Sequence, residues 1–260
     1  MVSAVVLAGY SRHSCIKDFN KAMLEMSGKW VIEYVISALE GAKNIDEIVV
    51  VGPKRDLEER IKDHMVVDDD GNFTKNCLKG YNHTKKGSNY TFFIYSDIPL
   101  ATSESIDYII DHCKGDYDFF IPIARRRTLL KFEESPLFHK LENFKYLKLA
   151  DGWMRTANSA LVNCDAVIEK TRFLQDIEDG YHMKKLFRLA SKWRLFLKLG
   201  PKPLFKYFIT KNLTLDDAAE FLTRKSGVRF KFIETPHPKT SIDIDTYEDY
   251  VAISNYLRSV

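Results

Sequence analysis

Val2-Ser-Ala-Val-Val-Leu-Ala-Gly9 is the stretch that decides the fold of this 260-residue chain. The apolar run over 2–7 predicts a short buried strand, which ends at Ala8-Gly9. A polar, basic loop follows, with Arg12 and Lys21 among its cations. Small residues let a ligand approach backbone N–H groups closely, and the two cations supply countercharge. This opening is typical of a phosphate-binding site, although a purely structural turn would have the same pattern.

Length and composition set outer limits on the class of protein. A chain of 260 residues forms one large domain, or one domain with a sizeable insertion, and 45% hydrophobic residues exclude general disorder. The net charge of +3 is too small to indicate nucleic acid as a partner. No apolar run reaches the ~18 residues that span a bilayer, and no signal peptide is evident. The scattered cysteines favour a reducing, cytoplasmic location.

Apolar periodicity predicts alternating strands and helices in the first half. Expected strands cover 46–53, 90–95 and 119–123, and expected helices cover 31–40 and a segment that opens at Thr102. A strand, a crossover helix and a second strand form a right-handed parallel unit. Between these elements the pattern predicts a charged surface helix over 55–64, a turn over 67–71, a short helix including 76–78 and a loop over 81–88.

The second half has a different character. Two antiparallel strands are expected over 146–149 and 159–162, around Asp151-Gly152, with a helical insertion over about 165–225. A strand over 228–233 and a last helix over about 247–258 complete the pattern. Together the elements predict an α/β fold with a mostly parallel central sheet flanked by helices.

Three carboxylates follow expected strands in positions suited to a ligand. Asp97 comes directly after the strand over 90–95, where open α/β sheets bind ligands. Asp243 and Asp245 are two residues apart on an extended segment and therefore point the same way. Such oxygen ligands suit Mg²⁺, which takes one or two carboxylates together with substrate phosphates. The alternatives are that Asp97 caps the next helix and that the other two are surface charges.

These stretches, in this order, resemble the nucleotidyltransferases with a MobA-like NTP-transferase domain. The resemblance is carried by Val5-Val-Leu-Ala-Gly9 with Arg12, by the run from Lys21 through Gly28 to Val35, by Ser96-Asp-Ile-Pro-Leu100, and by Ser241-Ile-Asp-Ile-Asp-Thr-Tyr-Glu-Asp249. The strand from Asp46 to Gly52 resembles the second strand of that family. The resemblance implies a GT-A-type, Rossmann-like fold and transfer of a nucleotidyl group to a small phosphorylated acceptor.

The resemblance also implies a role for individual residues. Leu7, Ala8 and Gly9 would hold the base and ribose through their backbone, and Gly52 would lie beside the nucleotide. Arg12 and Lys21 would bind the triphosphate. Asp97 and Asp245 would hold Mg²⁺ with Asp243 beside them, and Asn158 would help to hold the acceptor. Tyr10 stands where the family has a second glycine.

The resemblance divides a single domain, 1–260, into three parts. Residues 1–123 would bind an NTP, 124–240 the acceptor, and 241–260 would complete the metal site. The basic cluster Arg125-Arg126-Arg127 with Lys131 is either an acceptor site or a solvated face. The aromatic and basic stretch 193–209 is either a packed helix pair or a membrane-surface segment. The oligomeric state stays open, with a homodimer as one option.

Two other functions fit the same residues. A GT-A glycosyltransferase shares the sheet, but its Asp-x-Asp pair usually lies mid-chain, whereas Asp243 and Asp245 lie near the end of this chain. A non-catalytic nucleotide-binding protein is the third possibility, with Tyr10 marking lost activity. Pyrophosphate release from an NTP would separate nucleotidyl transfer from both.

Overall fold

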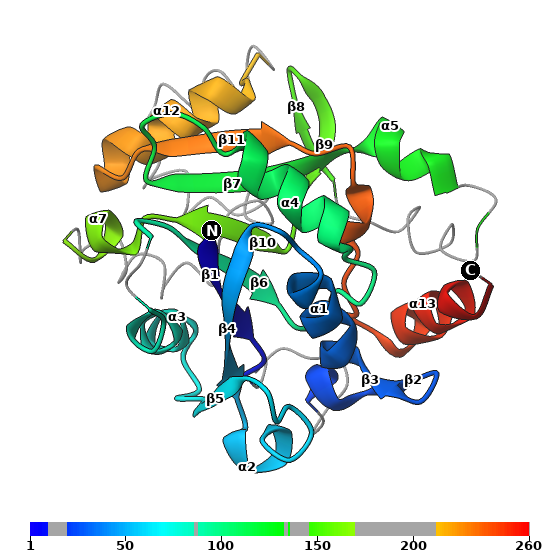
Figure 1. Ribbon diagram of the computed structural model, residues 1–260. Helices are drawn as coiled ribbons and strands as arrows, with labels where there is room; N and C mark the ends of the chain where they lie inside the picture. Colours follow the sequence, from blue (N-terminus) through cyan, green and yellow to red (C-terminus); the bar gives the residue numbers. More distant parts are fainter. Residues whose placement is uncertain (10–19, 86–87, 133–134, 136–145, 170–211, 260) are drawn as a thin grey trace.

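A computed structural model of the chain describes every residue except 10–19, 86–87, 133–134, 136–145, 170–211 and 260 (Figure 1). The described strands form a nine-stranded mixed sheet in the order β5-β4-β1-β6-β10-β7-β9-β8, with β11 paired to β7. Their bounds are β1 Val2–Leu7, β4 Ile45–Gly52, β5 Met65–Asp68, β6 Thr91–Tyr95, β7 Phe119–Arg125, β8 Leu147–Leu149, β9 Gly152–Thr156, β10 Ser159–Val162 and β11 Phe230–Glu234. A separate hairpin pairs β2 (Glu25–Met26) with β3 (Lys29–Trp30).

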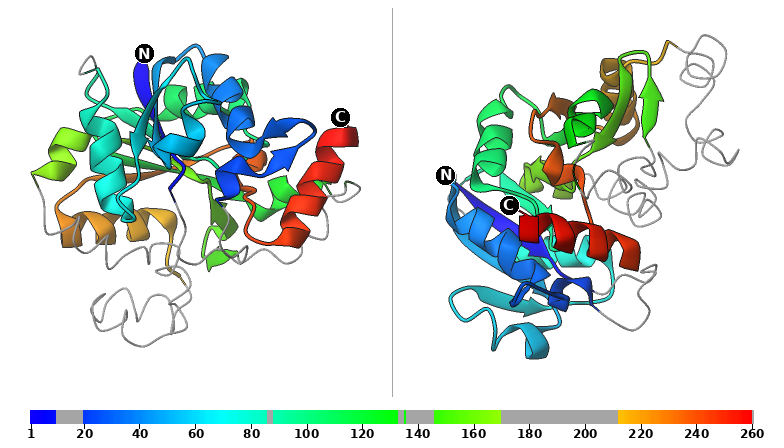
Figure 2. Two further views of the ribbon diagram at one scale, coloured as in Figure 1. Left: turned by 90° about the horizontal axis from the view of Figure 1, so that it is seen from below. Right: turned by 90° about the vertical axis from the view of Figure 1, so that its right-hand side faces the viewer.

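Helices cover both faces of this sheet (Figures 1 and 2). The α-helices among the described residues are α1 Val31–Glu40, α2 Lys54–Leu57, α3 Phe73–Asn82, α4 Ser103–His112, α5 Arg126–Leu129, α7 Cys164–Ile168, α12 Leu215–Ser226 and α13 Tyr247–Ser259. Three 3₁₀ turns accompany them: η1 Lys21–Met23, η2 Leu130–Phe132 and η5 Pro238–Ser241. The prediction of an α/β fold with a central sheet between helices is confirmed.

The sheet is parallel on one side and mixed on the other. Strand β1 pairs in parallel with β4 and β6, and β4 with β5, so this half consists of right-handed crossover units. Beyond β6, strand β10 runs antiparallel to both β6 and β7, and β9 runs antiparallel to β7 and β8. Strand β11 pairs in parallel with β7, so the sheet is mixed overall and not mostly parallel as predicted.

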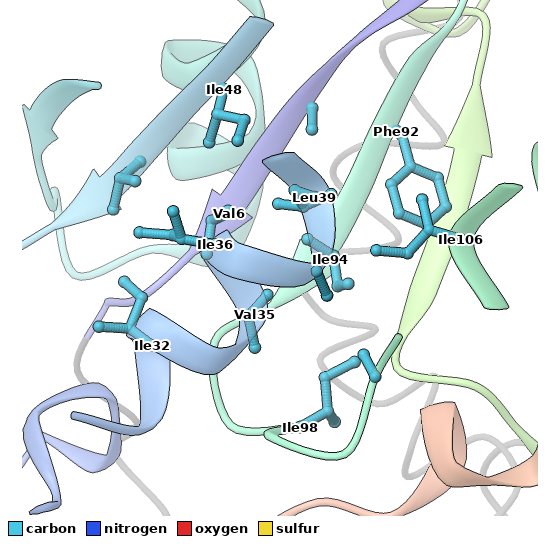
Figure 3. Close-up of a cluster of buried hydrophobic side chains, with 14 of the residues drawn as sticks. Val6, Ile32, Val35, Ile36, Leu39, Ile48, Phe92, Ile94, Ile98 and Ile106 are labelled. Atoms are coloured by element: carbon cyan, nitrogen blue, oxygen red, sulfur yellow. The ribbon is translucent and has the colours of Figure 1, made fainter. Parts of the chain in front are cut away.

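Alternate residues of β1 enter different cores, as the two-residue period of a strand requires. Ala4 and Val6 pack with α1 and α4, where Figure 3 shows Val6 beside Ile36 and Ile94. Val5 and Leu7 pack on the opposite face with residues of α3, α7 and α12. Both faces of this strand are buried, which explains why the sequence shows an apolar run without alternation.

A third core holds the end of the chain against the sheet. Ile242 and Ile244 are fully buried and pack with residues of α13, α5 and β7. Because side chains alternate along an extended segment, Asp243 and Asp245 point away from this core. The backbone N–H of Ile244 donates to the carbonyl of Asp97 at 3.0 Å. The sheet thus places the closing segment directly beside the end of β6.

Some predicted elements differ from the observed ones. The charged segment over 55–64 contains only the short helix α2, and the region expected as a turn over 67–71 overlaps strand β5. Helix α3 extends through 81–82, which the pattern assigned to a loop. Strand β8 pairs with the unpredicted β9, and not with β10. Of the helical insertion expected over 165–225, residues 170–211 lie outside the described part of the chain.

Candidate active site at the carboxyl ends of the strands

Lys21 joins carboxylates from two distant parts of the chain. Its Nζ lies 3.2 Å from Asp97 Oδ2 and 2.9 Å from Asp245 Oδ1. Asp97 follows β6, Lys21 begins η1, and Asp245 precedes α13, so three separate elements converge. Burial lowers the pKa of Lys21, but the attraction of Asp97 and then of Asp245 outweighs it, and the net pKa is raised. The Lys21 side chain is therefore a fixed ammonium ion at neutral pH.

The carboxylates of Asp97, Asp243 and Asp245 form one cluster. One oxygen from each lies within 4.8 Å of the others. Hard carboxylate oxygens at this spacing are the donors that Mg²⁺ takes in proteins, so the residues present fit such an ion. The three are not equivalent, because the Asp243 side chain is fully buried whereas that of Asp245 is 54% exposed.

The backbone around Asp245 is held by the start of the last helix. Asp249 Oδ2 accepts hydrogen bonds from the N–H groups of Asp245 and Thr246 at 2.8 and 2.9 Å. The Thr246 hydroxyl accepts in turn from the N–H of Asp249. This is the reciprocal pattern of a helix N-terminal cap, and it fixes the position of Asp245. Tyr247 begins α13, and its side chain is largely exposed.

The turn after β1 lies against Asp69, a carboxylate that the sequence analysis did not identify as a site residue. A Cβ on Gly9 would come 2.8 Å from Asp69 Oδ2 and 2.9 Å from Asn76 Nδ2, so any side chain here would force these two side chains or the turn to move. Asn76 donates to Asp69 Oδ1 at 2.6 Å and accepts from the N–H of Asp70. The signal available in the sequence was the run Asp68-Asp-Asp-Gly71 directly after an apolar pair.

Asn20 connects the turn to the lysine. Its side-chain amide donates to the carbonyl of Ala8 at 2.7 Å, and its Oδ1 accepts from the N–H of Ala22 at 2.9 Å. Asn20 is almost fully buried and caps η1, which begins with Lys21. The bond to Ala8 therefore brings Lys21 close to the end of β1. An asparagine before a short helical turn is the signal that could have identified this residue.

Leu7, Ala8 and Gly52, which were also predicted as site residues, contact neighbouring strands and loops. The N–H of Ala8 donates to Val51, and the carbonyl of Leu7 accepts from Ser96. Gly52 packs closely against Ala8 and Leu57, and its carbonyl accepts from Asp69. These bonds align the ends of β1, β4 and β6. Arg12 and Tyr10 lie outside the described residues.

Asn158 lies between β6 and the closing segment. Its carbonyl accepts from Tyr95, and its N–H donates to Thr240, both at 3.0 Å. The residue is 3% exposed, and within the described part of the chain its side-chain nitrogen has no hydrogen-bond partner. The structure thus brings Asn158 to the edge where Asp97 and Asp243 meet. A buried donor without a protein partner is free to bind a ligand oxygen.

The three arginines of the basic cluster after β7 do not all have the same partner. Arg125 bonds Glu234 at 2.7 Å, and Arg127 lies 3.6 Å from the same carboxylate. Arg126 lies over the ring of Tyr146. The Arg127 side chain is exposed, whereas that of Arg125 is largely covered, and an acceptor role for the cluster stays a prediction. The membrane-surface stretch 193–209 lies outside the described residues, and no helix among those described is long and apolar enough to cross a bilayer.

The fold is shared with solved transferases. A hypothetical transferase from Thermus thermophilus superposes with a TM-score of 0.73 at 21% identity, covering 95% of this chain and 98% of its own. A 4-diphosphocytidyl-2C-methyl-D-erythritol synthase from Anaerococcus prevotii gives a TM-score of 0.58 at 16% identity, with 99% and 96% coverage. The architecture is thus that of nucleotidyltransferase structures.

The family follows from the sequence match. Residues 4–179 match the model of the MobA-like NTP transferase domain, and the chain belongs to this family of nucleotidyltransferases. A probable molybdenum cofactor guanylyltransferase from Thermococcus gammatolerans is 32% identical over 116 residues, which is 44% of this chain and 57% of that protein. The chain thus spans little more than half the length of this relative. The resemblance noted in the sequence is confirmed, and it favours nucleotidyl over glycosyl transfer.

Proposed function

We propose that the chain transfers an NMP from an NTP to a small phosphorylated acceptor and releases pyrophosphate. The observation that carries the proposal is the convergence of Lys21, Asp97 and Asp245 beside the turn at Gly9. Membership of the MobA-like family supports the reaction class. The closing segment with Asp243 and Asp245 lies beyond the matched residues 4–179, so its role rests on the geometry alone.

In this proposal the nucleotide lies over the end of β1. Gly9 offers a backbone surface without a side chain, and Asp69 lies behind it as an acceptor for base or ribose donors. Lys21, with Arg12 as predicted from the sequence, neutralises charge on the phosphates. Leu7, Ala8 and Gly52 set the position of this surface through their contacts with neighbouring strands.

The acceptor phosphate would attack the α-phosphorus in line with the departing pyrophosphate. Positioning and charge neutralisation dominate such a reaction, because phosphoryl chemistry requires little covalent participation by the protein. Mg²⁺ bound to Asp97 and Asp245 would neutralise charge on the reacting phosphate oxygens. Lys21 stabilises the negative charge that develops on the leaving group. Asn158 supports the acceptor through its buried amide.

The proposal also assigns each ligand to a part of the chain. Residues 1–123 bind the NTP, 124–240 bind the acceptor, and the segment from 241 completes the ion site within one domain. Support comes from the common sheet, in which β10 of the second part lies between β6 and β7 of the first.

A pyrophosphate-release assay tests the function. The purified chain is incubated with Mg²⁺, each of GTP, CTP, UTP and ATP in turn, and a panel of phosphorylated acceptors. Release that depends on both acceptor and Mg²⁺ is expected with one preferred NTP. GTP and CTP are tested first, because the similar proteins include a probable guanylyltransferase and a cytidylyltransferase. The latter, the 2-C-methyl-D-erythritol 4-phosphate cytidylyltransferase of Clostridium perfringens, is 37% identical over 57 residues, which is 22% of this chain and 25% of that protein. NTP binding without release across the panel would favour a non-catalytic nucleotide-binding protein.

A further inference from the structure

The third carboxylate of the cluster is bound by an arginine from the second half of the chain. Arg155 Nη2 lies 2.7 Å from Asp243 Oδ1, and its Nε donates to the carbonyl of Ser241 at 2.9 Å. The Asp243 side chain is fully buried, and that of Arg155 is 15% exposed. Arg155 lies on β9, opposite Ala124 of β7. A β-strand of the sheet core thus holds the segment that carries Asp243 and Asp245.

We propose that Arg155 is a positioning residue of the divalent-ion site. It binds Asp243, and this leaves Asp97 and Asp245 as the carboxylates that hold the ion. The proposal rests on the proposed function, because it assigns the ion to the same cluster. Asp243 is then a structural carboxylate and not a third ligand.

The charge balance of the cluster supports this division. A fully buried carboxylate needs a paired cation, because its desolvation is otherwise too costly. Arg155 supplies that cation through a planar guanidinium that binds a side chain and a carbonyl at once, which an ammonium ion cannot reproduce in the same geometry. Lys21, by contrast, contacts the two more accessible carboxylates. The two cations therefore bind different members of the cluster.

The backbone geometry explains how Arg155 acts on Asp245. Its two bonds hold residues 241 and 243 of one extended stretch, whose alternate residues Ile242 and Ile244 are fixed in the third core. The next polar position is Asp245, on the same side as Asp243. A small rotation of this stretch would move the Asp245 carboxylate away from Asp97. The Asp249 cap and Lys21 hold the stretch at Asp245, and Ile244 bonds Asp97, so Arg155 is the restraint at its other end, at residues 241 and 243.

Mn²⁺ binding to the full-length, nucleotide-free chain tests the proposal without relying on turnover. Free Mn²⁺ is measured by electron paramagnetic resonance for the wild type, Arg155→Met, Arg155→Lys and the control Arg224→Met, whose arginine is 71% exposed on α12. Because outer-shell residues typically change metal affinity about 10–100-fold, Arg155→Met is expected to weaken Mn²⁺ binding by at least about tenfold. Arg155→Lys should be intermediate, and Arg224→Met unchanged.

The outcomes separate positioning from plain stability and from the proposed function. If Arg155→Met remains folded by circular dichroism and binds Mn²⁺ as tightly as the wild type, or more tightly, Asp243 is an available ligand and the proposal is overturned. If Arg155→Met does not fold, Arg155→Lys decides, and wild-type affinity in that variant likewise overturns it. A wild type and an Asp97→Asn variant that bind no Mn²⁺ either alone or with pyrophosphate present to engage Lys21 would remove the ion site itself, and with it the metal step of the proposed function.

Discussion

At the scale of single residues, the ammonium of Lys21 is the most informative group in the molecule. It lies between Asp97 and Asp245, where a divalent ion is also proposed, and it is anchored beside the end of β1 by its neighbour Asn20. A divalent ion bound there would therefore share these oxygens with the ammonium. Transfer of the ammonium to substrate phosphates would leave the carboxylates to the ion.

Lys21→Ala is expected to lower turnover by about two orders of magnitude, by analogy with the loss of one charge-stabilising donor. The fold should survive, because the lysine contributes no apolar core. Pyrophosphate release under saturating NTP and acceptor measures the effect, with the exposed Lys29→Ala as the matched control. Asp97→Ala should show a loss of similar size. Wild-type turnover in both variants would be incompatible with the proposed mechanism.

Gly9→Ala tests whether the turn after β1 adjoins the nucleotide. The new Cβ would lie 2.8 Å from Asp69 Oδ2, so the turn or the carboxylate must move. We expect NTP affinity to fall by about tenfold, equivalent to ~1.4 kcal/mol of binding free energy. Isothermal titration calorimetry with the preferred NTP measures it. A folded variant with unchanged affinity would place the nucleotide elsewhere.

At the scale of elements, helix α4 depends on a reciprocal cap. The Thr102 hydroxyl accepts from the N–H of Ser105 at 3.2 Å, and the Ser105 hydroxyl accepts from the N–H of Thr102 at 3.0 Å. Thr102→Ala should lower the free energy of unfolding by about 1 kcal/mol. Urea denaturation followed by circular dichroism measures the change. Thr102→Ser keeps the hydroxyl and should retain most of the stability; equal losses in the two variants would show that the cap is unimportant.

Elements with strong periodicity were predictable, and elements defined by tertiary packing were not. Strand β1 and helix α1 match their predicted ranges, because an apolar run and a three-to-four-residue repeat are local signals. Helix α3 was underestimated, because the polar segment over 81–88 was assigned to a loop. In the structure α3 packs so closely on β1 that a side chain at Gly80 would collide with Val5. Strand β5 was missed because it is only four residues long and overlaps the acidic segment over 67–71, which the pattern assigned to a turn.

The sequence predicted only those site residues whose charge and position beside an expected strand or helix indicate ligand binding. Lys21, Asp97, Asp243 and Asp245 follow strands or precede a helix, and the structure brings all four together. Nothing local distinguishes Arg155, which lies in the middle of a strand and becomes significant only through its contact with Asp243. Charge pairs between distant elements need a three-dimensional arrangement that a single sequence does not display.

Two partly buried thiols link the stability of the whole protein to pH. Burial raises the pKa of Cys113 from 9.0 to about 12, and burial and the neighbouring Cys164 raise the pKa of Cys77 further. A raised pKa in the folded state adds stability that is complete below pH 9 and is lost as pH rises toward 12, because the unfolded chain releases its protons first. Urea midpoints should therefore fall above pH 9.

Cys113→Ala is the matched variant for this pH effect. Its urea midpoint should fall less steeply between pH 9 and pH 10.5 than that of the wild type, because one thiol no longer titrates on unfolding. Parallel curves for the two proteins would show that this thiol is not buried in the way described.

The bond between Lys21 and Asp245 joins residues 224 positions apart in the chain. Closing so long a loop is slow compared with forming the local contacts of β1 and α1. During synthesis the parallel half of the sheet can therefore form on the ribosome before the ion site has received Asp245. A nascent chain arrested before Asp245 would be a folded but chemically silent intermediate, and competence would appear only when the closing segment leaves the exit tunnel.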